Sequence, residues 1–187
     1  MIRIITIYHI IAFVFTALLI SACNQKQNYK SLDFTSAESF FLGKNLTQLR
    51  ANHPDYTFKF YEGLGYHLLS GDSVENFMLV CDEKNDTIVS YEIQGNNYCF
   101  QDICIGSPLS VVQQAYPNIP VELSADRMKE FFTLKKATIE VQINIKSNIM
   151  NQVVGNYSQE NPARTSSYSS EGTIAGILIK KTDHSID

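Results

Sequence analysis

A thirteen-residue segment occurs twice in this chain, and this repeat restricts the fold more than any other feature of the sequence. Residues 42–54 (LGKNLTQLRANHP) align without gaps to residues 105–117 (IGSPLSVVQQAYP), at an offset of 63 positions. In both copies a glycine precedes apolar residues at helical spacing, and a proline ends the segment. An internal repeat of this kind is typical of one structural unit used twice, so we predict a short helix in each copy.

The residues at the two helix starts support this prediction. Asn45, with a glutamine three positions later, is typical of a capping pair at a helix N-terminus. Ser107 followed by Pro108 predicts an N-cap with proline in the first turn. Each copy therefore has its own reason to begin a helix at the same aligned position.

After each predicted helix the apolar residues alternate with polar ones, which is typical of strands in an antiparallel sheet. The strands expected after the first helix span residues 56–61, 65–70, 76–82, 87–94 and 97–104. Those expected after the second helix span residues 119–123, 129–134, 139–146 and 173–181. We also expect a short helix over 36–42, capped by Thr35 or Ser36, and a flexible loop over 155–172, which is rich in Ser, Asn and Gly.

These elements predict an α+β fold in which short helices pack on one face of an antiparallel sheet. Two tandem units, about 35–104 and 105–187, form a single globular domain over residues 35–187. If turns at 83–86 and 95–96 set the register, the core face carries Met78, Val80, Val89, Tyr91, Ile93, Tyr98 and Phe100. The other face then mixes polar residues with Phe77, Leu79 and Ile88, and it faces water or a partner.

The first 22 residues have a different character from the rest of the chain. Arg3 supplies one positive charge ahead of an uncharged run from Ile4 to Ala22, and this layout is typical of a signal peptide. The run approaches the ~20 residues that cross a bilayer, so an uncleaved transmembrane helix is an alternative. A second alternative is an ordinary secretory signal followed by an unmodified cysteine. The polar residues that follow Cys23 favour a tether over 23–34.

The end of this leader resembles a bacterial lipobox, in the residues Leu19, Ile20, Ser21, Ala22 and Cys23. Small side chains before the cleaved bond fit a tight peptidase pocket, and the cysteine thiol accepts the lipid. The resemblance implies that residues 1–22 are removed and that Cys23 carries a diacylglyceryl group, its amine often acylated as well. Several acyl chains together anchor a protein stably to a membrane, whereas one alone does not.

This resemblance also implies a cell-envelope lipoprotein. Asn24 stands where some lipoproteins have the aspartate that retains them at the inner membrane, which by family analogy favours the outer membrane. Removal of the leader takes away Arg3 but no acidic residue, so the chain's net charge changes from −4 to −5. This mild acidity argues against nucleic acid as a partner. Lys and Arg are scattered, so a second, electrostatic contact with the membrane is not indicated.

The three remaining cysteines, Cys81, Cys99 and Cys104, would meet oxidising conditions outside the cytoplasm. An odd number leaves at least one thiol unpaired, and their spacing does not settle which two pair. In the expected register Cys81 and Cys99 share a face, which allows a bridge between them. The alternative is that they are small buried hydrophobic residues. A metal site is disfavoured because no Cys-x-x-Cys pair occurs and the histidines that follow the leader lie far apart in sequence, at positions 53, 67 and 184.

No catalytic residue or cofactor is predicted. The sequence has no Gly-x-Ser-x-Gly elbow, P-loop, His-Glu-x-x-His motif or dinucleotide fingerprint. Cys81 or Cys99 with His67 would supply a nucleophile and a base, but both cysteines fall inside expected strands, where packing is the better explanation.

Two further groups of residues are better explained by structure than by binding. Asp82, Glu83 and Asp86 lack the spaced oxygen ligands of a calcium loop and suit a solvated turn. Aromatic residues at strand spacing favour core over a ligand groove; these are Tyr56, Phe58, Phe60 and Tyr61.

The two Gly-x-x-Leu-[Thr/Ser] helix starts, Gly43 to Thr47 and Gly106 to Ser110, are each closed by proline behind a lipobox. In this the chain resembles the lipoprotein group related to the beta-lactamase inhibitory protein and the small outer-membrane assembly lipoproteins. The resemblance implies an α+β module that works by surface contact and not by catalysis. No binding residue carries over, and the chain departs from the group in its loop 155–172 and in having no tryptophan.

Three functions follow as hypotheses. A non-catalytic interaction or assembly module with a protein partner in the envelope would show an exposed apolar patch. A ligand-binding or enzyme-inhibitory lipoprotein would show a concave site lined by residues such as Tyr66, Phe77 and Leu79. An unrecognised envelope enzyme would show a cleft with converging polar groups of displaced pKa. We expect the first.

Overall fold

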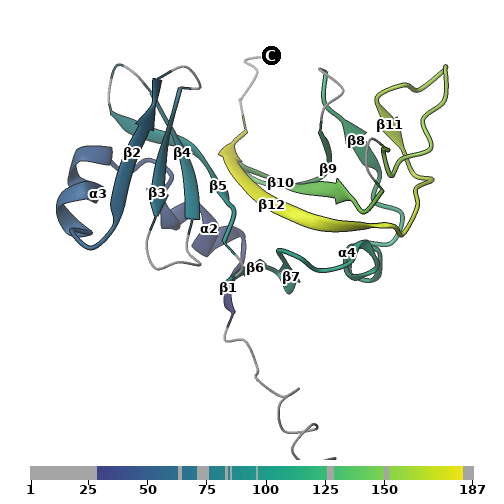
Figure 1. The fold of residues 1–187 in the computed structure, drawn as a ribbon, viewed down its shortest axis with the longest axis horizontal. Helices are drawn as coiled ribbons and strands as arrows, with labels where there is room; N and C mark the ends of the chain where they lie inside the picture. Colours follow the sequence, from purple (N-terminus) through teal and green to yellow (C-terminus); the bar gives the residue numbers. More distant parts are fainter. Residues whose placement is uncertain are drawn as a thin grey trace, which may run out of the picture.

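The computed structural model describes residues 29–62, 65–70, 76–82, 84, 86–95, 97–125, 129–149 and 152–182. The predicted signal peptide, the lipobox and Cys23 lie outside these residues, as do Glu83 and His184. Within the described part the fold is α+β, with three short helices, a nine-stranded antiparallel sheet and a small mixed sheet (Figure 1). None of the described helices is long and apolar enough to cross a membrane.

The two repeated segments form the helices α3 (Leu46–Asn52) and α4 (Leu109–Ala115), which confirms the helix predictions. Asn45 is the N-cap of α3, and its side chain accepts a hydrogen bond from the Gln48 amide at 3.0 Å. The expected cap of α4 is wrong by one residue. Pro108 holds the N-cap position and supplies no side-chain bond, because a proline ring has no acceptor.

The helix α2 (Phe34–Phe40) begins earlier than the sequence predicted. Its N-cap is Asp33, whose carboxylate accepts a hydrogen bond from the Ser36 amide at 2.7 Å. The Ser36 hydroxyl in turn accepts one from the Asp33 amide at 2.8 Å. The expected cap at Thr35 or Ser36 is therefore wrong: Asp33 is the N-cap, and Ser36 completes the reciprocal capping box as the third residue of the helix.

The large sheet joins both halves of the chain, with the strand order β11-β8-β9-β10-β12-β5-β4-β3-β2. The first half supplies β2 (Thr57–Tyr61), β3 (Tyr66–Ser70), β4 (Asn76–Asp82) and β5 (Thr87–Ile93). The second half supplies β8 (Val121–Leu123), β9 (Glu130–Lys136), β10 (Ile139–Ser147) and β12 (Gly172–Lys181). Because β5 pairs with β12, the two halves share one continuous sheet.

A smaller sheet contains β1 (Lys30–Leu32), β6 (Tyr98–Phe100) and β7 (Ile103–Cys104). The single strand expected over 97–104 is therefore wrong. Gln101 and Asp102 both have positive φ, at 46° and 68°, and this turn folds the segment back on itself. β6 then pairs in parallel with β1, not with β5.

The predicted core face of the first half is partly wrong. Phe77, Leu79 and Ile88 are buried, whereas Val80 and Val89 are 37% and 40% exposed. The cause is a β-bulge: Val80 pairs with Ser90 and Cys81 with Ile88, so Val89 is an additional residue that exchanges the two faces. Beyond the bulge the prediction is confirmed for the buried side chains of Tyr91, Ile93, Tyr98 and Phe100.

The segment 155–172, expected to be a loop, includes the short strand β11 (Arg164–Thr165), which extends the sheet beside β8. A buried carboxylate holds the start of this segment. Glu130 accepts hydrogen bonds from the amides of Val154 at 2.7 Å and Gly155 at 2.8 Å, and from the Tyr157 hydroxyl at 2.9 Å. The sequence predicted neither the strand nor these contacts.

Both halves attach their helix starts to the sheet in the same way. The Gly43 amide bonds to the Ile88 carbonyl at 2.9 Å, and the Ile88 amide bonds to the Lys44 carbonyl. In the second half the Gly106 amide bonds to the Ile174 carbonyl at 2.8 Å, and the Ile174 amide bonds to the carbonyl of Ser107. Both glycines have a positive φ, 76° and 85°, a conformation that glycine adopts without steric cost.

Candidate interaction surface

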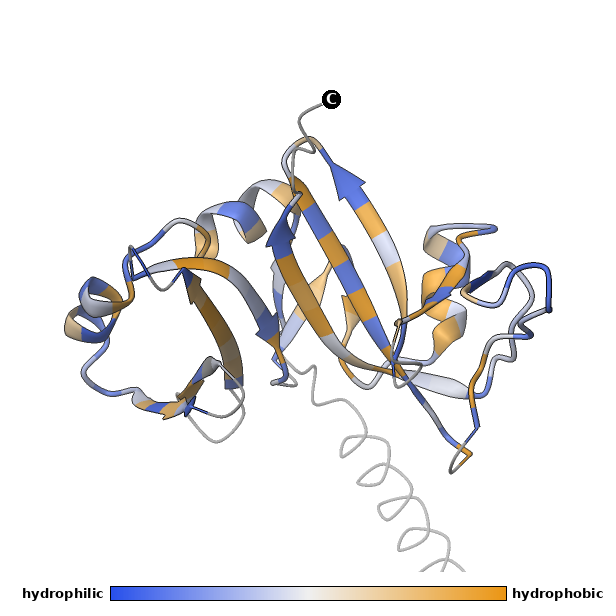
Figure 2. Cartoon of the chain, turned by 90° about the horizontal axis from the view of Figure 1, so that it is seen from above, coloured by the Kyte–Doolittle hydropathy of each residue, from blue (hydrophilic) through white to orange (hydrophobic). Residues whose placement is uncertain are grey.

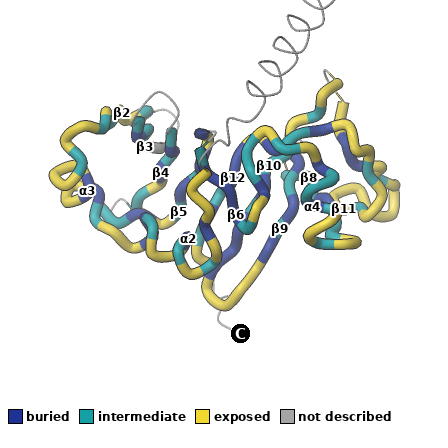
Figure 3. Tube along the Cα trace, turned by 90° about the horizontal axis from the view of Figure 1, so that it is seen from below, coloured by how far each residue is buried: buried dark blue, intermediate teal, exposed yellow. Residues whose placement is uncertain are grey.

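The nine-stranded sheet has one face that carries the apolar core and one that does not. On the core face the Tyr91 hydroxyl donates to the Ala37 carbonyl of α2 at 2.6 Å, and Leu109 and Val112 of α4 are fully buried. Figure 3, seen from below, shows buried strands between the more exposed helices and loops. Figure 2, seen from above, shows no described helix in front of the strands in the middle of the sheet.

We call this second side the open face and define it by the side chains that alternate with the core positions. They belong to β4, β5, β9, β10 and β12 and include Met78, Val80, Ser90, Glu92, Phe131, Thr133, Lys135, Glu140, Gln142, Asn144, Gly176, Leu178 and Lys180. The sheet is strongly curved, with β2–β4 on one side and β8–β9 on the other side of β10 and β12 (Figure 1).

A charged cluster occupies the second half of the open face. Glu140 forms hydrogen-bonded ion pairs with Lys135 at 3.0 Å and Lys180 at 3.1 Å, and it accepts a hydrogen bond from the side-chain Nε2 of Gln142 at 2.8 Å. Burial raises the pKa of Glu140, but the bonds from the two lysines and Gln142 together outweigh it and hold that pKa below its ordinary value. Glu140 is therefore a fixed anion at neutral pH.

A second polar contact crosses the middle of the sheet. Glu92 of β5 accepts a hydrogen bond from the Asn144 side chain of β10 at 2.7 Å, passing over Gly176 of β12. A side chain at Gly176 would begin 2.5 Å from a Glu92 carboxylate oxygen, so glycine is required there for this contact. Glu92 and Asn144 thus hold each other in place, whereas the Thr133 hydroxyl on the same face is buried without a hydrogen-bond partner among the described residues.

Apolar side chains occur in both halves of the open face. Met78 and Val80 point outward from β4, Phe131 of β9 lies opposite Asn144, and Leu178 of β12 lies opposite Glu92. Val80 is 37% exposed, and neighbouring Val89 in the bulge is 40% exposed. The open face therefore combines partly exposed apolar groups with ordered charges.

The structure corrects the expected disulfide. Cys99 is bonded to Cys104, and Cys81 has a free thiol. The bridge between Cys81 and Cys99 does not form, because β6 leaves the large sheet and Cys99 lies opposite Cys104 in the β6–β7 hairpin. Burial, followed by the nearby Asp86 charge, raises the pKa of Cys81 to about 11, so this thiol stays protonated at neutral pH.

His67 lies on the core side of β3, stacked near Phe60 at a ring distance of 4.6 Å. Its Nδ1 is buried without a hydrogen-bond partner in the described part of the chain. Burial, followed by the charge of Arg50, lowers the pKa of His67 against the opposing effect of Asp86, and so favours the neutral ring. The nucleophile and base arrangement with Cys99 is excluded, because that sulfur is in a disulfide.

The concave site that a ligand-binding lipoprotein would show around Phe77 and Leu79 is not formed by these two residues. Both side chains lie in the core, 1% and 0% exposed, and the Tyr66 side chain lies outside the described part.

Asp86 binds the start of α3, accepting hydrogen bonds from the Thr47 amide and hydroxyl at 3.0 and 2.7 Å. No group of three potential metal ligands occurs among the described residues.

Two shallow depressions lie away from the open face, and the sequence indicated neither. One of about 590 Å³ is lined by Leu123, Val153, Tyr157, Ser158, Gln159 and Pro162. Burial and the bond to Glu130 raise the pKa of Tyr157, so its hydroxyl acts there as a donor. The other, of about 440 Å³, lies along α3 and is lined by Gly43, Lys44, Asn45, Gln48, Leu49, Asn52 and His53.

No protein-family model matches the chain, and no curated protein matches its sequence. Its structure is similar to an extracellular protein containing an SCP domain from Bacillus anthracis, with a TM-score of 0.39 and 13% identity over 83% of this chain and 49% of that one. A cysteine-rich secretory protein from Staphylococcus aureus has a TM-score of 0.39 and 13% identity, over 77% and 46%. The uncharacterized protein yfeY from Escherichia coli has a TM-score of 0.42 and 10% identity, over 82% and 99%.

The chain thus spans about half the length of the first two of these proteins. Those two are described as extracellular or secretory, and the third as uncharacterized. Likenesses this distant carry no argument about binding or catalysis, so the function rests on the residues described above.

Proposed function

We propose that this chain is a lipid-anchored module of the bacterial cell envelope, located at the outer membrane. In this proposal it binds a partner protein through its open face and performs no catalysis. The observation that carries this proposal is the open face itself. Val80 is partly exposed there, and the same row of side chains crosses the sheet through Ser90 and Lys180 to Glu140. An exposed apolar patch rimmed by polar groups is typical of a protein-binding site.

The lipid anchor is supported by the lipobox that ends at Cys23. The disulfide between Cys99 and Cys104 agrees with this address, because such bonds persist in oxidising compartments outside the cytoplasm.

We further infer that the chain contains two tandem repeats whose helices pack on the same face of the sheet. The matching contacts of Gly43 and Gly106 support this inference. So do the isolated β-bridges Asn45–Thr87 and Pro108–Thr173, because Pro108 follows Asn45 by the same 63 positions as in the sequence repeat. This arrangement is also what the resemblance to the beta-lactamase inhibitory protein and the assembly lipoproteins implies.

The proposal is tested by site-specific photo-crosslinking in cells that produce the full chain. A photoreactive phenylalanine analogue replaces Val80 or Gln142 on the open face, or Gln48, an exposed residue of α3, as the matched control. We expect both open-face positions to give the same crosslinked protein and the control position not to give it. A product from Gln48 alone, or none from the open face, would contradict the proposal.

A substitution then separates contact from proximity. Val80→Asp places a charge in the apolar part of the open face without opening the core, since Val80 is already partly exposed. We expect this variant to lose the crosslink at Gln142, whereas Gln48→Asp keeps it. Circular dichroism checks that both variants fold.

One observation favours a ligand-binding lipoprotein as a second candidate. The depression beside Tyr157 has a volume in the range of about 300–1,000 Å³ that small-molecule sites occupy. Ligand protection of Tyr157 from chemical modification would support this candidate, and the Val80→Asp variant would leave it unaffected.

A further inference from the structure

The end of the fold nearest the predicted lipid anchor is held firmly to the domain. β1 begins at Lys30, whose amide donates to the Asn97 carbonyl at 2.7 Å, and the Gln101 amide donates to the Leu32 carbonyl at 2.9 Å. Leu32 is buried, and the disulfide between Cys99 and Cys104 closes the hairpin with which β1 pairs. The position of Lys30 is therefore fixed relative to the rest of the domain.

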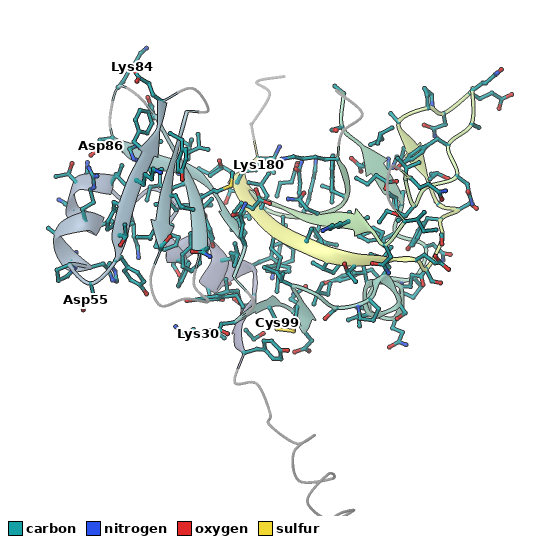
Figure 4. The ribbon with its side chains drawn as sticks, in the orientation of Figure 1. Lys30, Asp55, Lys84, Asp86, Cys99 and Lys180 are labelled. Carbon is teal, nitrogen blue, oxygen red and sulfur yellow. A yellow bond between two sulfur atoms is a disulfide. The ribbon has the colours of Figure 1, made fainter. Side chains whose placement is uncertain are left out.

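This anchored end lies on the side opposite the open face. In Figure 4 Lys30 and Cys99 lie at the lower side of the molecule, whereas Lys180 of the open face lies at the upper side. Figure 1 shows β1 and β6 beneath the place where β5 meets β12. The two surfaces are thus separated by the thickness of the sheet and of the layer below it.

The chain between lipid and fold is too short to let the domain turn over. Lys30 follows Cys23 by seven residues, which span at most about 25 Å when fully extended. A domain of this length has a radius of gyration of roughly 15 Å and therefore a diameter near 40 Å. Turning the open face toward the membrane would place Lys30 about one diameter away, beyond the reach of these residues.

We propose that the surface formed by β1, β6 and β7 faces the lipid bilayer, so that the open face points away from the membrane. This orientation rests on the proposed lipid anchor at Cys23. The residues at the anchored end suit a lipid headgroup region: Tyr29 is 43% exposed, and Lys30 is exposed beside it. The open face is then directed at partners in the aqueous compartment, not at other proteins embedded in the bilayer.

The tether, and not charge attraction, sets this orientation. The anchored end carries Asp33 and Asp102 as well as Lys30, so it offers anionic lipids no excess of positive charge. The orientation should therefore persist at high salt and in bilayers without anionic lipid, conditions that release proteins held by basic patches.

The test uses the lipidated full chain in nanodiscs of phosphatidylethanolamine and phosphatidylglycerol that contain a nitroxide-labelled headgroup lipid. A ketone-bearing phenylalanine analogue at position 29, or at position 135 on the open face, carries a fluorophore. Lys135 suits this because Glu140 keeps its other partner, Lys180. We expect several-fold stronger quenching at position 29 than at position 135, with no change on adding salt.

A longer tether provides the matched control. Insertion of about 20 Gly and Ser residues after Asn28 lengthens the tether to about 27 residues, which span at most about 95 Å when fully extended and so let the domain reorient. We expect this insertion to remove the difference between the two positions.

Equal quenching at both positions of the uninserted chain, or a difference that survives the insertion, would overturn the orientation alone. Mass spectrometry of the same sample reports the acyl chains. A product without them would overturn the anchor and this orientation together, so the two failures are distinguishable.

Discussion

The two halves of the sheet keep the same positions apolar on the core face but differ at equivalent positions of the open face. β4 pairs with β5 as β10 pairs with β12, and both pairs contain a bulge at the same place, before Cys81 and before Ile145. On the core side Phe77 and Leu79 correspond to Val141 and Ile143, all of them buried.

On the open face Met78 and Val80 of the first half correspond to Gln142 and Asn144 of the second. Where the two halves meet, Glu92 of β5 lies opposite Leu178 of β12, so a charged residue of the first half faces an apolar residue of the second. Folding requires apolar side chains only on the core side, so the two halves can differ on the open face without loss of the core.

The largest effect is expected from removing equivalent core side chains. Ile88 and Ile174 are 0% and 1% exposed and receive the two helix starts. We expect Ile88→Ala and Ile174→Ala each to lower the free energy of unfolding by about 3 kcal/mol, within the usual range for isoleucine truncation. Urea unfolding followed by circular dichroism measures this.

Because β5 and β12 join the halves, each variant should still unfold in one transition. Exposed Val89→Ala, in the same bulge, is the control and should change stability by less than about 0.5 kcal/mol. Two separate transitions, or an effect confined to one half, would show that the halves are not equivalent in energy.

A second prediction concerns a contact that sharpens the comparison. The connection between β4 and β5 is short, whereas that between β10 and β12 is long and is held by Glu130. Glu130→Ala leaves two buried amides without an acceptor, which should cost about 2–3 kcal/mol. Hydrogen exchange at Val154 and Gly155 should accelerate in this variant.

The control for that variant is Glu122→Ala. Glu122 lies near the same segment and pairs with Arg164 at 3.8 Å, but it is more exposed, so little stability should be lost. Unchanged exchange at Val154 in Glu130→Ala would mean that the carboxylate does not hold the connection.

The sequence predicted the parts of the fold that depend on local pattern. The repeat located α3 and α4, and the strict alternation from Ile139 to Lys146 located β10. It assigned the wrong face to Met78 and Val80, because a single additional residue in a bulge exchanges the faces and leaves no mark in the pattern.

The candidate site was less predictable than the fold. That Glu140 binds two lysines depends on the pairing of β9, β10 and β12, and these strands are brought together by long-range contacts. The bridge between Cys99 and Cys104 depends on a turn at Gln101 and Asp102, which are not glycines although both adopt a positive φ.

A third, smaller effect is expected at the helix starts, where the halves again differ. Asn45 caps α3 with its side chain, whereas Pro108 at the equivalent position makes no such bond. Asn45→Ala should lower the free energy of unfolding by about 1 kcal/mol through loss of the cap. Pro108→Ala should cost about half as much or less, through the freer unfolded chain alone. Equal costs in urea unfolding would remove this difference between the halves.

The smallest effect is expected at Glu140, the charge that the first half lacks at the equivalent residue, Asn76. Its pKa is lower in the folded than in the unfolded chain, since the bonds from Lys135, Lys180 and Gln142 outweigh the opposing effect of burial. The stabilisation is therefore complete above the unfolded-state pKa of about 4.3 and is lost as pH falls through the folded-state value. Glu140→Gln should be less stable than the natural chain by less than about 1 kcal/mol at neutral pH, and the difference should vanish in acid. A constant difference across pH would mean that packing, and not this anion, distinguishes the second half of the open face.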